Sequence, residues 1–397
     1  MSSETLLKIR GLKVEGRSDT GWQPILRGID LDLKPGEVLG LIGESGAGKS
    51  TLGLAAMGFV RDGCRFSGGT VHFKGEELVT ASRTRRRALR SSEIAYVAQS
   101  AAASFNPAYK LVDQYSEFPV LRGTMSRRDA EADAAVMYAR LRLPEPNDIG
   151  FRYPHQVSGG QLQRAMTAMA MACRPELIIF DEPTTALDVT TQIEVLSAIR
   201  EAVQELGTAA IYVTHDLAVV AQMADRVMVL RNGAEVEVAE TRRMLTAPQE
   251  DYTKSLWAVR AFHSPEKPAL TFGTVPLVSL QNVTASYGAK TVLEDVSFDI
   301  FPGRTVAVVG ESGSGKSTAA RVLTGLLPPD RGTVQYEGEA LPDSSRLRSK
   351  DQLRHAQMIY QMADTALNPK HRLRKIIGRP LQFYLGLRGR ALETRIR

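Results

Sequence analysis

The stretch VLGLIGESGAGKSTLGLAAMGF, residues 38–59, decides how this chain folds. An apolar, β-prone run ends in a glycine-rich loop at Gly43 and continues from Ser50 as a helix-like sequence. Glycines in such a loop let backbone N–H groups turn toward phosphate oxygens, and the positive end of the following helix adds to the attraction. The order strand, loop, helix therefore predicts a phosphate-binding site in an α/β domain.

The polar residues of this loop suit nucleotide phosphates. Lys49 can reach the β- and γ-phosphates, and Ser50 offers a hydroxyl to Mg²⁺, a hard ion that takes oxygen ligands. A glycine turn followed by a chance Lys-Ser pair is the alternative, and the flanking strand and helix disfavour it. The predicted phosphate-binding residues are Gly43, Ser45, Gly46, Gly48, Lys49, Ser50 and Thr51.

The loop occurs twice. GESGAGKST at 43–51 and GESGSGKST at 310–318 differ at one position and lie 267 residues apart. The preceding segments, ILRGIDLDLKPGE (25–37) and VLEDVSFDIFPGR (292–304), match at the same spacing. A repeat of this length is a duplicated domain rather than a solenoid unit of about 20–50 residues. The second copy adds the candidates Gly310, Gly313, Gly315, Lys316, Ser317 and Thr318.

The repeat divides the chain into two homologous domains, residues 4–260 and 275–397. Between them AFHSPEKPALTFGT (261–274) is rich in Pro, Ser, Thr and Gly, as a linker would be. The second copy is incomplete, because the counterpart of Ser158 would fall near residue 420. We expect the sequence to be part of a longer chain. The alternative is that first domains from separate chains pair with each other.

Composition narrows the function classes. Fifty Lys and Arg against 44 Asp and Glu give a net charge of +6, too small an excess to indicate a nucleic-acid partner. The first residues do not form a signal peptide, and no apolar run approaches the roughly 18 residues of a spanning helix. Cys64 and Cys173 form no metal or redox motif. We therefore expect a chain that does not span a membrane and works in a reducing cytosol.

Two acidic residues close the apolar run in ELIIFDEP, residues 176–183. A buried parallel strand would deliver both at its carboxyl end, where α/β sheets bind ligands. Asp181 suits a direct or water-mediated hold on Mg²⁺, and Glu182 suits polarising an attacking water. A solvated acidic turn is the alternative.

Three further segments gain meaning from their order along the chain. AIYVTHD (210–216) contains His215 after a β-prone run, and Gln99 follows IAYVA; taken alone, either is an ordinary strand-end residue. In VSGGQLQRAMTAMAMAC (157–173) a serine N-cap and two glycines precede a helix. Such a helix start is a second anion site, and since the domain already has a phosphate loop, we predict that it serves the phosphate of another domain. Its residues are Ser158, Gly159, Gly160 and Gln161.

In this order the motifs resemble the ATP-binding subunits of ABC transporters. The resemblance covers essentially the whole chain and rests on the loop 43–51, Gln99, the signature SGGQ, LIIFDE at 177–182 and His215. It implies a P-loop NTPase fold of ABC type, α/β with a parallel-sheet core, an antiparallel β subdomain and a helical subdomain, in two tandem copies of which the second is incomplete. In that family two domains pair head to tail, with each ATP between the loop of one and the signature of the other.

The resemblance also implies roles for single residues. Lys49, Ser50 and Thr51 would bind phosphate and Mg²⁺, with Gln99 and Asp181 completing the metal shell. Further implied roles are the catalytic base for Glu182, a γ-phosphate contact for His215, coupling between the two sites for Asp188, metal binding for Ser317 and Gln361, and stacking on adenine for Tyr287.

The first copy departs from the family at the stacking position. The counterpart of Tyr287 there is Gly16, and Trp22 in the adjoining loop is the candidate substitute.

Within the family, YPHQVSGGQLQRAMTAMAMACRPELIIFDEPTTALDVTTQ (153–192) is similar to the importers of dipeptides, oligopeptides, nickel or glutathione. FNP at 105–107 and APQEDYTKSL at 247–256 fit the same group. The resemblance implies an ATPase on the inner face of the cytoplasmic membrane that drives two transmembrane permease subunits, which an extracytoplasmic solute-binding protein supplies.

Two other functions compete with this one. A soluble twin-domain ABC ATPase without a permease would carry a long charged linker or coiled coil, whereas 261–274 is short and has one Glu and one Lys. A non-hydrolysing nucleotide-dependent regulator fits the incomplete second copy, but Glu182 argues against it.

Overall fold

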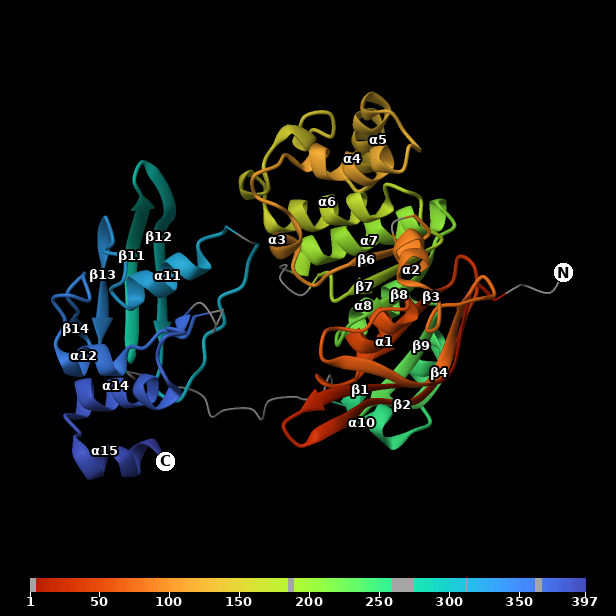
Figure 1. The fold of residues 1–397 in the computed structure, drawn as a ribbon. Helices are drawn as coiled ribbons and strands as arrows, with labels where there is room; N and C mark the ends of the chain where they lie inside the picture. The colour runs from red at the N-terminus through yellow and green to blue at the C-terminus, as the bar shows by residue number, and fades with distance from the viewer. Residues whose placement is uncertain (1–4, 91, 185–188, 259–274, 312, 361–365) are drawn as a thin grey trace. The chain divides into compact units, whose positions relative to one another are not determined.

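The computed structural model describes residues 5–90, 92–184, 189–258, 275–311, 313–360 and 366–397 (Figure 1). The chain divides into two compact units, residues 1–264 and 265–397, and each is described by itself. The predicted linker, Asp188 and Gln361 lie outside the described residues.

The first unit is built on a six-stranded sheet in the order β10-β9-β3-β8-β7-β6. Strands β9 to β6 run parallel, and β10 is an antiparallel edge. β3, β7 and β8 are buried at every residue, as apolar runs without polar alternation predict for a sheet covered on both faces. The strands are β3 (Val38–Ile42), β6 (Ile94–Val97), β7 (Leu177–Asp181), β8 (Ala209–Val213), β9 (Arg226–Arg231) and β10 (Ala234–Glu240).

An antiparallel sheet, in the order β2-β1-β4-β5, packs over the helix that follows the first loop. Leu52 and Ala55 of that helix share one core cluster with residues of β1 and β3. The elements are β1 (Leu7–Ser18), β2 (Gly21–Leu33), β4 (Cys64–Phe73), β5 (Glu76–Glu77) and α1 (Lys49–Ala56).

The helical region forms the upper part of the first unit in Figure 1, above the six-stranded sheet. Its core includes Tyr115 and Tyr138, whose rings meet edge to face at 5.9 Å. The helices are α3 (Ala101–Ser104), α4 (Leu111–Leu121), α5 (Arg127–Arg140) and α6 (Gly159–Met171). The remaining helices of the unit are α2 (Arg83–Arg90), α7 (Val189–Glu205), α8 (Leu217–Met223), α9 (Thr241–Thr246) and α10 (Asp251–Ala258), with 3-10 turns at Ile149–Phe151 and Pro154–Gln156. The three predicted parts of the fold are thereby confirmed.

The second unit repeats the antiparallel sheet, in the order β12-β11-β13-β14, and the helix after the loop. Among its described residues no parallel strand occurs, and 305–309, the counterpart of β3, is not a strand. Its elements are β11 (Val278–Tyr287), β12 (Lys290–Ile300), α11 (Lys316–Leu323), β13 (Arg331–Tyr336), β14 (Glu339–Ala340), α12 (Lys350–His355), α14 (Leu373–Leu385) and α15 (Gly389–Ile396).

Across the described parts of both units, every helix is too short or too polar to cross a membrane.

Candidate active site

The first loop wraps tightly between β3 and α1 because two of its glycines admit no side chain. Gly43 has φ +147°, and a Cβ there would lie 2.1 Å from the carbonyl oxygen of Leu230. Gly48 caps α1 in the left-handed region, where a Cβ would lie 2.8 Å from a methyl of Leu26. The predicted loop geometry therefore depends on close backbone approach at both ends.

Lys49 turns back over the loop that precedes it. Its Nζ donates to the carbonyl oxygens of Gly43 (2.8 Å) and Glu44 (3.0 Å), and the residue is only 7% exposed. Burial lowers the pKa of the Lys49 ammonium, while the nearby charges of Glu182 and Asp181 oppose that shift. The cation thus lies beside the two acids that the sequence predicted from a segment more than 130 residues away.

Asp181, at the end of β7, joins the loop to the sheet. Its Oδ1 accepts a hydrogen bond from the Ser50 hydroxyl (2.8 Å), and its Oδ2 accepts one from the Tyr96 hydroxyl (2.6 Å). Burial, and then the bond to Asp181, raise the pKa of Tyr96. Sequence reasoning missed Tyr96. The signal was a tyrosine within a β-prone apolar run, where a partly buried hydroxyl usually finds a polar partner.

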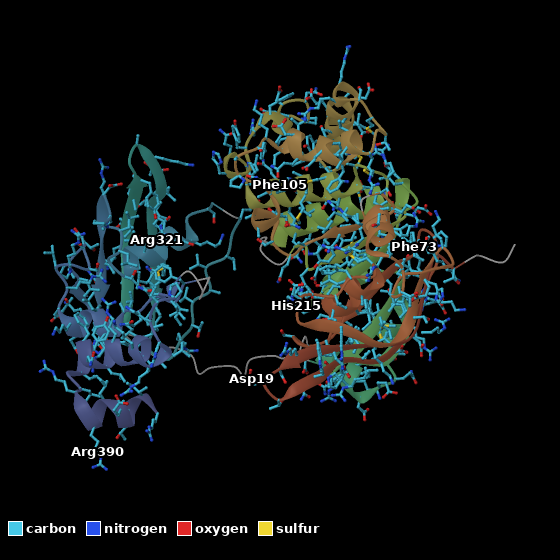
Figure 2. The ribbon with its side chains drawn as sticks, viewed as in Figure 1. Asp19, Phe73, Phe105, His215, Arg321 and Arg390 are labelled. Carbon is cyan, nitrogen blue, oxygen red and sulfur yellow. The ribbon has the colours of Figure 1, made fainter. Side chains whose placement is uncertain are left out.

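Glu182 follows β7 in a left-handed conformation, φ +49°, which costs a non-glycine residue on the order of 1–3 kcal/mol. Its N–H donates to the carbonyl oxygen of Val213 on the neighbouring strand β8 at 2.9 Å, which extends the pairing of β7 with β8 to this residue. The side-chain Oε2 accepts from Gln99 Nε2 at 3.1 Å, and Oε1 lies 3.0 Å from His215 Nδ1. His215 is at the surface of the first unit (Figure 2), its side chain 59% exposed.

These three polar residues come from consecutive neighbours in the sheet. Gln99 follows β6, Glu182 follows β7 and His215 follows β8, which are adjacent parallel strands. The carboxyl ends of these strands meet at one edge of the sheet. Gln99 and His215, which are weak candidates for site residues when taken alone, therefore both contact Glu182, the candidate catalytic base.

One cavity collects most of the predicted residues of the first copy. Besides Ile25, its lining residues are Ser45, Gly46, Gly48, Lys49, Ser50, Thr51, Gln99, Asp181 and Glu182.

The signature residues do not line this cavity. Ser158 caps α6, with its Oγ accepting from the Gln161 N–H (3.3 Å) and its own N–H donating to Gln161 Oε1 (2.9 Å). A Cβ on Gly159 would meet no atom within 4 Å, so the start of α6 is open. That this helix start serves another domain's phosphate stays a prediction.

Trp22, the candidate substitute for the adenine-stacking residue, does not lie on the same side of its hairpin as Gly16, the counterpart of Tyr287. Gly16 pairs with Gln23 and Arg17 with Trp22, so Gly16 and Trp22 face opposite sides of the hairpin. The Arg65 guanidinium lies 4.1 Å from the centre of the Trp22 ring. On the Gly16 side, a Cβ would meet the Ile25 side chain at 2.9 Å.

In the second unit Tyr287 is exposed at the end of β11. Its hydroxyl accepts a hydrogen bond from Arg321 (2.9 Å), which lowers the pKa of Tyr287. The loop there keeps its form, because Lys316 Nζ donates to the carbonyl oxygens of Gly310 (2.7 Å) and Glu311 (2.6 Å).

The donor set of the first site fits Mg²⁺. A hydroxyl (Ser50), a buried carboxylate (Asp181) and an amide (Gln99) supply hard oxygen atoms around one cavity. Within the described residues there is no group of three or more His, Cys, Asp and Glu side chains that could hold a metal by themselves. Mg²⁺ typically binds through one or two carboxylates and takes its other ligands from phosphates and water.

Comparison with known proteins agrees with the site. The sequence model of the family described as "ABC transporter" matches residues 26–185 and 293–391, one range in each copy. The chain is 33% identical over 437 residues to the "Glutathione import ATP-binding protein GsiA" of Salmonella choleraesuis, an alignment that spans all of this chain and 70% of that protein. The chain belongs to the ABC transporter family. The protein of the same name from Pectobacterium atrosepticum is 33% identical over 442 residues, with the same coverage.

Solved ABC cassettes share the fold. A dimeric structure of MJ0796, titled a bacterial ABC transporter cassette, matches with a TM-score of 0.54 and 25% identity over 59% of this chain and 99% of that one. CbiO1 from Clostridium perfringens matches with a TM-score of 0.54 and 24% identity over 65% of this chain and 94% of that one. As a member of the ABC family, this protein is an ATPase that binds and hydrolyses ATP.

Proposed function

We propose that this ABC ATPase powers an importer for peptides or a related small solute. The proposal is supported by the similarity to proteins named for glutathione import, since glutathione is itself a short peptide. The main structural support for ATP hydrolysis is the position of Glu182. Its side chain is held between Gln99 and His215 beside the phosphate loop.

In the proposed mechanism the loop and Lys49 bind the phosphates, and Ser50, Asp181 and Gln99 hold Mg²⁺. The bound ion would neutralise charge on the phosphate oxygens. Glu182 polarises the attacking water, a step worth about 10²–10⁴-fold in rate. Its two oxygens are fixed by neighbours on either side, so the carboxylate is oriented before the nucleotide arrives.

His215 has a second task in this mechanism. The exposed imidazole that holds Glu182 is also available to contact the γ-phosphate. A γ-phosphate would thereby be sensed by the residue that orients the base.

The two domains, 4–260 and 275–397, are proposed to act through head-to-tail pairing within or between chains. The loop at 310–318 would bind a second nucleotide opposite the signature, residues 158–161. Asp188 and Gln361 would contribute to these sites, a proposal that rests on their positions in the sequence.

ABC importers act through permease partners, and the finer proposal here is two transmembrane permease subunits supplied by an extracytoplasmic solute-binding protein. The protein would then lie against the inner face of the cell membrane. Dependence of ATP turnover on those permease subunits distinguishes this function from that of a soluble twin ABC ATPase.

The test is the substitution Glu182→Gln. We expect phosphate release to fall by about 10²-fold or more while ATP binding is retained, since the amide keeps the size of the side chain but is not a base. Glu176→Gln is the matched control: this glutamate starts the same segment but pairs with Lys74 at the surface (2.6 Å). Turnover that is equal in both variants would contradict the assignment of Glu182 as the catalytic base.

A further inference from the structure

Tyr96 lies directly behind the candidate metal ligand. Asp181 is 5% exposed, and its two carboxylate oxygens have different partners. Oδ1 faces Ser50 across 2.8 Å, on the side of the phosphate loop, whereas Oδ2 is bonded to the Tyr96 hydroxyl at 2.6 Å. The tyrosine therefore donates its hydrogen bond to the carboxylate oxygen that points away from the loop.

The sheet fixes this contact. Tyr96 on β6 pairs in parallel register with Ile179 on β7, and Asp181 lies two residues further along β7 on the same face. The Tyr96 ring packs against the core cluster of the first unit and lines a second cavity with Ile94, Phe118 and Met169. Strand register and ring packing together leave the hydroxyl little freedom to move.

We propose that Tyr96 is a positioning residue for Mg²⁺, which fixes the Asp181 carboxylate so that Oδ1 is presented to Ser50 and to the ion. The inference rests on the proposed function, in which Ser50 and Asp181 hold that ion. Hydrogen bonds to the far side of a ligand set its orientation, and losing such a partner commonly costs about 10–100-fold in metal affinity. Without the Tyr96 hydroxyl, the carboxylate would keep the bond from Ser50 and lose the one that holds its other oxygen.

Tyr96→Phe removes the hydroxyl and keeps the ring contacts. We expect binding of a fluorescent ATP analogue in EDTA to stay within about twofold of wild type, while the Mg²⁺ concentration that gives half of the Mg²⁺-dependent gain in binding rises about 10-fold or more. Tyr115→Phe is the control, because Tyr115 also donates to a carboxylate, Asp133, but within the helical region. It should lose stability in thermal unfolding and keep the wild-type Mg²⁺ midpoint.

The possible results distinguish a failure of the Tyr96 inference from a failure of the proposed Mg²⁺ site on which it rests. If Ser50→Ala and Asp181→Asn leave the Mg²⁺ midpoint unchanged, the proposed metal site is wrong and the inference falls with it. If those two variants raise the midpoint and Tyr96→Phe does not, the metal site stands and the inference is overturned. A Tyr96→Phe protein that loses binding in EDTA and in Mg²⁺ to the same degree would show a purely structural role, which also overturns it.

Discussion

The two phosphate loops have nearly the same sequence and nearly the same φ angles at the glycines that the structure describes in both. Gly43 and Gly310 have φ +147° and +149°, and Gly48 and Gly315 have φ +100° and +95°. In both loops the lysine ammonium donates to the first two carbonyl oxygens of its own loop. This conformation is local, because nine residues specify it twice.

Their surroundings differ. The first loop follows β3, which is buried at every residue between β8 and β9, whereas 305–309 before the second loop forms no strand and Val309 is 87% exposed. Ser50 reaches Asp181, while its counterpart Ser317 is exposed. The comparison shows that a phosphate loop forms from its own residues, but a hydrolytic site needs strands contributed from elsewhere in the chain.

The largest expected difference is in catalysis. Lys49→Ala should lower ATP turnover by about 10²-fold or more, because the ammonium lies beside both acids and would stabilise charge on the phosphates. Lys316→Ala should lower turnover less than about fivefold, since Ser317 beside it is exposed in the described structure, whereas Ser50 beside Lys49 is bonded to Asp181. Steady-state phosphate release at saturating ATP measures both. Equal losses would mean that the two loops contribute alike to hydrolysis, and the comparison would fail.

The second difference is in folding stability. Gly43→Ala puts a Cβ against the backbone oxygen of Leu230 and should destabilise the first unit by about 2–4 kcal/mol. In Gly310→Ala the nearest atom is the Ser314 hydroxyl at 2.8 Å, a side chain that can rotate away.

Tryptophan fluorescence during urea unfolding separates these two effects. The chain has two tryptophans, Trp22 and Trp257, and both belong to the first unit. Gly43→Ala should therefore shift the fluorescence transition, and Gly310→Ala should leave it in place. A comparable shift in both variants would show that the units do not unfold independently.

The third expectation concerns the residues around Glu182. His215→Ala removes the partner of Oε1 and leaves Gln99 on Oε2, so kcat should fall about 10-fold, less than on removing the base itself. Nucleotide affinity, measured by equilibrium binding, should change less than about threefold. A loss confined to affinity would indicate that His215 contributes to phosphate binding and not to the orientation of Glu182.

The sequence predicts local features well. Gly43, Lys49, the strand that ends at Asp181 and the Ser158 cap were predicted from patterns of fewer than ten residues, which carry their own conformational preferences. Tyr96 and the joint arrangement around Glu182 depend on which strands are neighbours. That is fixed by contacts between residues more than 80 positions apart for β6 and β7, and 33 positions apart for Glu182 and His215.

Segment 305–309 also shows that local sequence does not decide whether a strand forms. By the repeat it matches β3, yet it forms no strand, because the described residues of its unit offer no parallel partner for its backbone N–H and C=O groups. A β-prone sequence is thus not sufficient for a strand, because strand partners must also be available.

The smallest expected difference is at the base of the nucleotide. Trp22 faces away from Gly16 and its ring lies against the Arg65 guanidinium, so Trp22→Ala should change ATP affinity at the first loop less than about twofold. Tyr287 is exposed at the end of β11, and Tyr287→Ala should weaken ATP binding at the second loop about three- to tenfold, as expected for one lost aromatic contact. Each measurement needs the other loop disabled, by Lys316→Ala or Lys49→Ala respectively, with a fluorescent nucleotide as ligand. If Trp22→Ala weakens binding as much as Tyr287→Ala does, the hairpin must turn its outer face to the base when nucleotide binds, and the two units would recognise adenine alike.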